Sequence, residues 1–304
     1  MYKKKTHLLV IGGTGFIGYH LILKAKKKGW KVSSLSLNKP KKERYVSNVN
    51  YLIANISNLA EIKRKLKPHY AYVVNLGGYV NHGFSSEIKK EILKTHFLGT
   101  INLAKIFSKK KIKKFIQAGS SAEYGFAKSP QNENSICSPK SPYAKAKLAS
   151  TKYLLGLYQT KKFPATILRF FQVYGPKQEQ NRILPKIIEG CLNNENIPVS
   201  PGNQMRDFSY IDDVIEAIFL TLNSKKMDGE IINIGSGKPR TLKSTMRKIC
   251  REIGKGKLQF GKIKYRKDEN MKVYPNINKA RAKLKWQPKT PFSFGIKLVI
   301  NSFR

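Results

Sequence analysis

Residues 7–18 read HLLVIGGTGFIG, a short apolar run that passes directly into a glycine-rich turn. The run predicts a buried strand, and apolar residues spaced four apart after the turn predict a helix. Gly13, Gly15 and Gly18 satisfy the pattern GxGxxG, and Gly12, Gly15 and Gly18 equally satisfy GxxGxxG. Such a turn lets a pyrophosphate approach the backbone and the N-terminus of the helix. The stretch therefore predicts a dinucleotide-binding site.

The pattern of a strand followed by a helix repeats along the first half of the chain. Further short apolar runs predict strands over residues 31–37, 51–55, 70–78, 114–120 and 165–171. Strands that alternate with helices form parallel sheets covered on both faces, and right-handed crossovers make such sheets doubly wound. We therefore expect an α/β fold with a Rossmann-type doubly wound parallel sheet, and a ligand at the carboxyl edge of that sheet.

The composition of the sequence changes after VYGP at residues 173–176. Pro and Gly become frequent there, and the predicted helices and strands become shorter. The run GEIINIGSG at 229–237 nevertheless predicts one more buried strand that returns to the main sheet. These features predict two intimate domains rather than two separate ones. The expected boundaries are a dinucleotide-binding domain over 1–172, to which 209–236 returns, and a smaller C-terminal substrate-binding lobe over 173–208 and 237–304.

The composition is that of a globular protein with an extreme charge. The 304 residues carry 59 Lys and Arg against 18 Asp and Glu, a formal net charge of +41. Only 11 of the 59 are arginines, the residue best suited to reading phosphates and bases, and the lysines are spread over the whole chain. The charge therefore predicts no specific nucleic-acid partner, and it leaves open a surface that attracts small anions.

The cysteines and apolar runs bear on the cellular compartment. Cys137, Cys191 and Cys250 form neither a CxxC pair nor a metal-ligand cluster, and the five histidines show no metal-ligand spacing. Three such cysteines fit a reducing compartment, and the first apolar run is too short for a secretory signal. No stretch approaches the roughly 20 apolar residues of a membrane span. We expect a cytoplasmic protein with no metal and no membrane insertion.

The stretch SPYAKAK at 141–147 predicts the start of a helix, with Ser141 as N-cap and Pro142 as first residue. Tyr143 and Lys147 then lie one turn apart on one face. If this helix flanks the cofactor, we expect the ammonium group of Lys147 to stabilise the phenolate of Tyr143 and to lower its pKa toward neutrality. Such a tyrosine can exchange a proton with a substrate oxygen while a nicotinamide exchanges hydride.

Two serines, Ser120 and Ser121, end the strand predicted at 114–120 and lie at the carboxyl edge of the sheet. Either hydroxyl can complete a set with Tyr143 and Lys147 by orienting the reacting oxygen. Together with the glycine turn, this set gives the chain both a cofactor site and a proton-transfer group. The combination predicts an enzyme rather than a binding module.

Six motifs follow one another in an order that is typical of one family: GGTGFIG, GSSAEYG, SPYAKAK, LRFFQVYGP, RDFSYIDDV and INIGSGKP. The chain resembles the extended short-chain dehydrogenase/reductase family, the NAD-dependent epimerase/dehydratase group that modifies nucleotide sugars. The resemblance runs from about residue 7 to about residue 290. It implies that Ser120, Tyr143 and Lys147 are catalytic, with Ser121 as the alternative serine.

The resemblance also implies where the ligands bind. Arg206 matches an arginine that binds the diphosphate of the nucleotide sugar, which suits a bidentate guanidinium. Three further residues are expected on the substrate, namely Ser121, His82 and Gln172. The residues expected on the cofactor are Gly12, Gly13, Thr14, Gly15, Phe16, Ile17, Gly18, Ser36, Asn38, Asn55, Ile56, Leu76, Gly77 and Gly78, with Tyr143 and Lys147.

The residues after the catalytic serine bear on the type of reaction. The 4,6-dehydratases of the family carry an acidic pair there, whereas this chain has Ser121 and Ala122, and Glu123 is expected to face away. Hydride transfer at C4 of the sugar is therefore favoured over dehydration. GSSAEYG is similar to the corresponding stretch of 4-keto-6-deoxysugar reductases, so reduction of a nucleotide 4-keto-6-deoxysugar is favoured. The alternative is a 4-epimerase with tightly bound NAD.

The cofactor is expected to be NAD or NADP, with NADP slightly favoured. The second strand ends near Ser36 and Asn38 without a carboxylate to bind the ribose 2′-hydroxyl of NAD, and Lys41, Lys42 and Arg44 follow. The family resemblance further implies a homodimer formed through long helices. A non-catalytic RNA-binding member is the competing interpretation, and the retained catalytic set argues against it.

Overall fold

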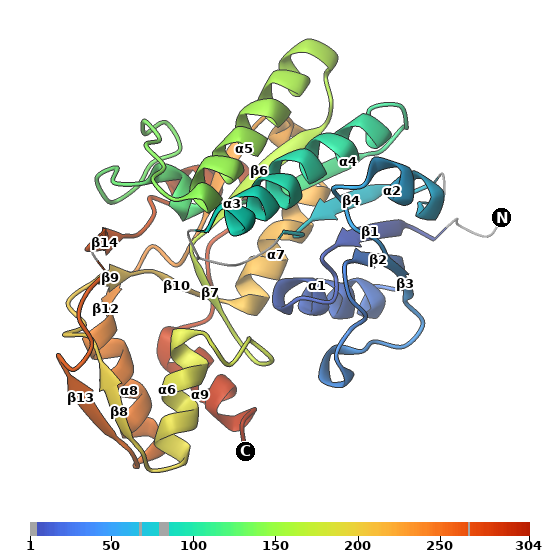
Figure 1. Ribbon diagram of the computed structural model, residues 1–304. Coiled ribbons are helices and arrows are strands. Elements are labelled where there is room, and N and C mark those ends of the chain that lie inside the picture. Colours follow the sequence, from blue (N-terminus) through green and yellow to red (C-terminus); the bar gives the residue numbers. More distant parts are fainter. Residues whose placement is uncertain (1–4, 67–68, 79–84, 267) are drawn as a thin grey trace.

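The computed structural model describes residues 5–66, 69–78, 85–266 and 268–304. A parallel sheet of seven strands forms the centre of its larger part (Figure 1). In order across the sheet the strands are β11 (Ile231–Ile234), β6 (Ala165–Phe170), β5 (Lys114–Ser120), β4 (Tyr72–Asn75), β1 (His7–Ile11), β2 (Lys31–Ser36) and β3 (Asn50–Ile53). The α/β Rossmann-type sheet expected from the sequence is confirmed.

Helices cover both faces of this sheet. On one face α1 (Phe16–Lys27) packs beside α7 (Ile211–Leu222) (Figure 1). The helices of the other side are α2 (Leu59–Lys65), α3 (Ser86–Leu93), α4 (Gly99–Phe107) and α5 (Pro142–Lys161). The side chains of β1 alternate between two cores, Leu8 and Val10 with the first helix pair and Leu9 with α2, α4 and α5. Both faces are therefore apolar, which explains why the strands are nearly continuous hydrophobic runs.

The order of the strands creates the crevice in which a ligand can bind. β1 pairs with β2 on one side and with β4 on the other, so the chain reverses direction across the sheet at this point. Such a reversal opens the carboxyl edge of the sheet. Gly12 follows β1 and Gly77 follows β4, and a Cβ on Gly12 would lie 2.9 Å from the Gly77 nitrogen. Because Gly12 also has a φ of +75°, only glycine fits there.

A smaller lobe is assembled from segments that follow β6 in the chain. Its strands form three small sheets, which pair β7 (Gln172–Tyr174) with β10 (Phe208–Tyr210), β8 (Asn196–Val199) with β13 (Lys257–Phe260), and β9 (Met205–Arg206) with both β12 (Arg240–Thr241) and β14 (Lys272–Val273). Its helices are α6 (Ile183–Leu192), α8 (Leu242–Ile253) and α9 (Phe292–Asn301). The exact domain boundaries expected from the sequence remain a proposal.

Short helical turns complete the secondary structure of the described residues. They are η1 (Lys42–Arg44), η2 (Lys94–Leu98), η3 (Ser121–Tyr124), η4 (Lys225–Met227) and η5 (Ala280–Leu284). Within the described ranges, no helix combines the length and the apolar character needed to cross a membrane. The turn that matters most for the site is η3, because it follows β5 directly at the carboxyl edge.

The contact between α1 and the glycine turn can be tested with two Gly→Ala substitutions in helices. A Cβ on Gly18 would lie 2.3 Å from the Gly12 carbonyl oxygen, whereas a Cβ on Gly156 of α5 meets no atom within 4 Å. Gly18→Ala should lower the free energy of unfolding by about 1–3 kcal/mol. Gly156→Ala should raise it by about 0.5–1 kcal/mol. Urea unfolding measures both, and equal stability of the two variants would contradict the packing described.

Candidate active site

A cavity of about 1170 Å³ runs along the carboxyl edge of the sheet and continues into the smaller lobe. Nearly all residues predicted from the sequence line it. They are Gly12, Thr14, Gly15, Phe16, Ile17, Gly18, Ser36, Asn38, Asn55, Ile56, Leu76, Gly77, Gly78, Ser120, Ser121, Tyr143, Lys147, Gln172 and Arg206. Gly13 is absent from this lining because it packs on Ser34, whose Oγ would lie 2.4 Å from an added Cβ. His82 lies outside the described residues.

The glycine turn presents a surface that suits the diphosphate of a dinucleotide. Helix α1 begins at Phe16 with Gly15 as N-cap, and its first turn carries no acidic residue. The first N–H groups of a helix have no partner within the helix and attract anions. The nearest atom to a Cβ on Gly15 is the Gly12 carbonyl oxygen at 3.4 Å, so Gly15 leaves the backbone open toward the cavity. The residues present therefore fit a dinucleotide.

The ribose end of this surface carries polar side chains. Ser36 and Asn38 line the cavity, and the Ser36 hydroxyl accepts a hydrogen bond from the Thr14 N–H at 3.3 Å. Arg44, however, is buried and binds Glu179 at 2.9 Å and the carbonyl oxygen of Lys177 at 3.0 Å. Of the basic residues that follow the second strand, Arg44 is therefore already paired with a loop that is distant in the sequence.

Helix α5 begins as the sequence predicts and places the tyrosine and lysine together. The Ser141 hydroxyl caps the helix by accepting a hydrogen bond from the Ala144 N–H at 3.1 Å. Lys147 is buried, and its ammonium group donates to the Ala118 carbonyl oxygen at 2.8 Å. The same nitrogen lies 5.9 Å from the centroid of the Tyr143 ring. Lys147 therefore joins α5 to β5 directly behind the tyrosine.

The electrostatics of this pair contradict one expectation. Burial raises the pKa of the Tyr143 phenol, and the Ser120 hydrogen bond and the charge of Arg182 only partly offset this effect. Burial likewise lowers the pKa of Lys147 to about 8, against the opposing effect of Glu123. The lowered Tyr143 pKa expected from the sequence is therefore wrong for this structure, because desolvation of the two buried groups dominates.

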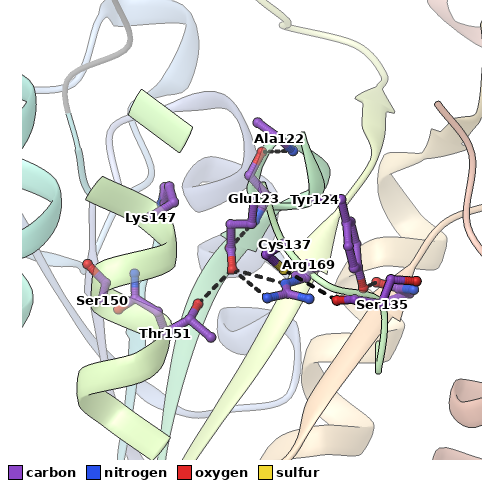
Figure 2. A network of polar contacts seen from close by, with 12 residues as sticks. Ala122, Glu123, Tyr124, Ser135, Cys137, Lys147, Ser150, Thr151 and Arg169 are labelled. Carbon is purple, nitrogen blue, oxygen red and sulfur yellow. Dashed lines mark hydrogen bonds and ion pairs between the residues drawn. The ribbon is translucent and has the colours of Figure 1, made fainter. Parts of the chain in front are cut away.

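A turn anchored on a buried ion pair holds Ser120 in place. The Ser120 N–H donates to Glu123 at 2.8 Å, and the Ser120 hydroxyl accepts from the Ala122 N–H at 3.2 Å. Figure 2 shows the Glu123 carboxylate between Thr151 of α5, whose hydroxyl donates at 2.9 Å, and Arg169 of β6, which pairs with it at 2.9 Å. Glu123 is fully buried, so it faces away from the cavity as expected.

Two residues near Tyr143 were not identified as functional from the sequence. His96 is buried and lines the cavity, with its ring edge-on to the Tyr143 ring at 5.0 Å between centroids. Gly78 makes room for it, because an added Cβ would lie 2.0 Å from the His96 ring. Arg182, just before α6, also lines the cavity and lowers the pKa of Tyr143.

The far end of the cavity carries Arg206, on β9 of the smaller lobe. Its guanidinium forms an ion pair with Glu269 and donates to the Met205 carbonyl oxygen at 2.9 Å. Glu269 and Arg266 line the cavity beside it, and neither belongs to a motif that the sequence singles out. Across the described residues, no group of three His, Cys, Asp or Glu could hold a metal ion. Two arginines against one carboxylate leave a net positive charge at this end, which favours an anionic ligand although Glu269 already pairs with Arg206.

The ion pair beneath Ser120 can be tested by Glu123→Gln. This change leaves the Arg169 charge buried without its partner, which should lower the free energy of unfolding by about 3–5 kcal/mol. The matched control Thr151→Val removes one hydrogen bond of the same carboxylate and should cost about 1–2 kcal/mol. Urea unfolding compares the two. Equal costs would show that the ion pair is not what stabilises the turn.

The pKa of Lys147 predicts a pH-dependent stability. Unfolded lysine keeps its proton up to a pKa of about 10.4, whereas the folded protein loses it at about 8. The unfolded state binds more protons between these values, so stability rises with pH in this window. The free energy of unfolding of the wild type should therefore rise by about 1–3 kcal/mol relative to that of Lys147→Met from pH 7 to pH 10.5. Urea unfolding measures this change, and a difference between the two proteins that stays constant with pH would contradict the prediction.

Comparison with known proteins shows which family the chain belongs to. The "Putative UDP-glucose 4-epimerase" of Methanocaldococcus jannaschii is 31% identical over 303 residues, which cover 97% of each chain. The UDP-glucose 4-epimerase of Thermotoga maritima, solved with UDP-glucose, superposes with a TM-score of 0.91 at 28% identity, covering 98% of this chain and 99% of that one.

Two further relatives include one solved with NAD and one dehydratase. The UDP-glucose 4-epimerase of Thermus thermophilus, solved with NAD, has a TM-score of 0.88 at 26% identity over 98% of this chain and 99% of that one. A dTDP-D-glucose 4,6-dehydratase of Dictyostelium discoideum is 30% identical over 75% of this chain and 58% of its own. The family pattern itself matches residues 8–235. The chain belongs to the NAD dependent epimerase/dehydratase family.

Proposed function

We propose that this protein exchanges hydride at C4 of a nucleotide sugar, and that it does so as a 4-epimerase of a UDP-hexose. The observation that carries the proposal is the meeting of Ser120 and Tyr143 in one cavity, with Lys147 behind them. One end of that cavity fits a dinucleotide. The other end is lined by Arg182, Arg206 and Arg266, and we infer that an anionic substrate binds there and displaces Glu269, which pairs with Arg206 in this structure. The UDP-hexose comes from the names of the epimerases that the chain resembles.

The proposed chemistry assigns one task to each residue. The dinucleotide, when bound, would supply the hydride acceptor and, in its oxidised form, a positive charge. Tyr143 takes the proton of the C4 hydroxyl, and Ser120 holds the same oxygen by a hydrogen bond. Positive charge lowers the pKa of a phenol, so a cation near Tyr143 favours the phenolate that burial otherwise opposes. The keto sugar rotates in the cavity, and Tyr143 returns the proton to the oxygen once the opposite face of C4 is reduced.

The turn after Ser120 argues against dehydration. Ser121 and Ala122 occupy the positions where a 4,6-dehydratase is expected to have acids. Glu123 is buried against Arg169 and does not line the cavity. Elimination across C5 and C6 therefore has no acid or base from this turn.

The second candidate is the reductase favoured by the sequence analysis. It is supported by the ribose end of the cavity, where Ser36 and Asn38 stand in place of a carboxylate and leave room for exchangeable NADP. The named relatives are epimerases and a dehydratase, one of them solved with NAD, so we give the epimerase precedence. The NADP preference, the homodimer and the cytoplasmic location remain predictions.

The role of Tyr143 is tested by Tyr143→Phe, assayed for interconversion of UDP-glucose and UDP-galactose. The variant loses the proton-transfer group, so kcat should fall by about 10²–10⁴ while the dinucleotide still binds. Tyr153→Phe is the matched control, because Tyr153 lies on the same helix and outside the lining of the cavity, and it should keep full activity. Full activity in Tyr143→Phe would refute the mechanism.

A further inference from the structure

Two cysteines that are 59 residues apart in the sequence meet in the smaller lobe. Cys191 lies on α6 and Cys250 on α8, and their sulfur atoms are 2.7 Å apart. Both are free thiols in this structure. The sequence gives no sign of this pairing, because the two residues belong to separate helices without a CxxC spacing. Because the two thiols are in contact, they can react with each other.

The packing of two helices brings the two thiols close enough for a bond to form after a small movement. Helix α6 packs along α8 (Figure 1), and this packing brings the two sulfur atoms together. A disulfide needs sulfur atoms about 2.05 Å apart and Cβ atoms that point toward each other. Cys191 is fully buried, whereas Cys250 is partly exposed and is therefore the more accessible of the two residues. Cys137 lies on a different segment and has no cysteine beside it within the described residues.

We propose that Cys191 and Cys250 form a reversible redox site that a low-molecular-weight disulfide, such as oxidised glutathione, converts to an intramolecular disulfide. In the first step the Cys250 thiolate attacks the reagent, forms a mixed disulfide and releases one thiol. In the second step the Cys191 thiol, whose pKa is raised by burial and by Cys250, gives up its proton as its sulfur attacks the Cys250 sulfur. The second half of the reagent leaves and takes up a proton as the second thiol. Two protein thiols are thereby oxidised by two electrons, one reagent disulfide is reduced to two thiols, and a dithiol reductant reverses the reaction.

The position of the pair gives the bond a structural consequence. Helix α6 contributes Leu184 and Ile187 to the wall of the cavity, and α8 contributes Leu242 and Met246. A disulfide would tie these two walls together at the substrate end. The glycine turn and Tyr143 belong to other elements, so the cofactor end is not constrained. We therefore expect oxidation to stabilise the smaller lobe and to leave the affinity for NAD unchanged within about twofold.

The test uses the full-length protein, incubated with oxidised glutathione or with dithiothreitol and then alkylated and mapped by peptide mass spectrometry. Oxidation should link Cys191 to Cys250 and leave Cys137 alkylated. Since the bond closes a long loop, it should raise the melting temperature by roughly 5 °C or more, reversibly. Cys250→Ser should abolish the link and the shift, and the control Cys137→Ser should keep both.

Two results would overturn the proposal. One is a peptide map in which Cys191 and Cys250 both remain alkylated after oxidation, and the other is a linkage that involves Cys137 or a second chain. The mapping is made on the unmodified sequence, so it holds even if a variant folds poorly. None of these results depends on turnover, and the redox site therefore stands or falls separately from the proposed epimerase activity.

Discussion

The carboxylate of Glu123 is the interaction on which the geometry of the site depends. It is fully buried, and it joins three elements by accepting from the Ser120 N–H, from Thr151 on α5 and from Arg169 on β6. A buried carboxylate is costly unless its oxygens are paired and hydrogen-bonded, and here they are. The turn that carries Ser120 is thereby fixed to the helix that carries Tyr143 and Lys147. Only 18 acidic residues occur in 304, and one of them has this structural task.

The second constraint is desolvation at the catalytic pair. Burial raises the pKa of Tyr143 and lowers that of Lys147, so in this structure each group is held closer to its neutral form. Cations that line the cavity act against this effect on the tyrosine, and Arg182 already does so. The net charge of +41 adds a general attraction for an anionic nucleotide sugar. Reactivity of the tyrosine is therefore coupled to what occupies the cavity.

Features that depend on local sequence patterns could be predicted, whereas features that depend on contacts between distant residues could not. The strand, glycine turn and helix at the N-terminus, and the cap at Ser141, could be predicted because each depends on neighbours in the sequence. The pairing of Arg44 could not be predicted, since its partner Glu179 is 135 residues away. The raised pKa of Tyr143 could not be predicted either, because the spacing shows the nearby lysine but not the burial of the two side chains. The contact between Cys191 and Cys250 and the partner of Glu123 were hidden for the same reason.

The most direct test of the account is to denature the purified protein and identify the nicotinamide nucleotide that it releases. The cavity, its glycine turn and the epimerase interpretation predict close to one NAD per chain, because an epimerase holds its cofactor through the whole cycle. Release of no nicotinamide nucleotide, together with no binding of added NAD or NADPH, would contradict the central claim that this cavity supports hydride exchange.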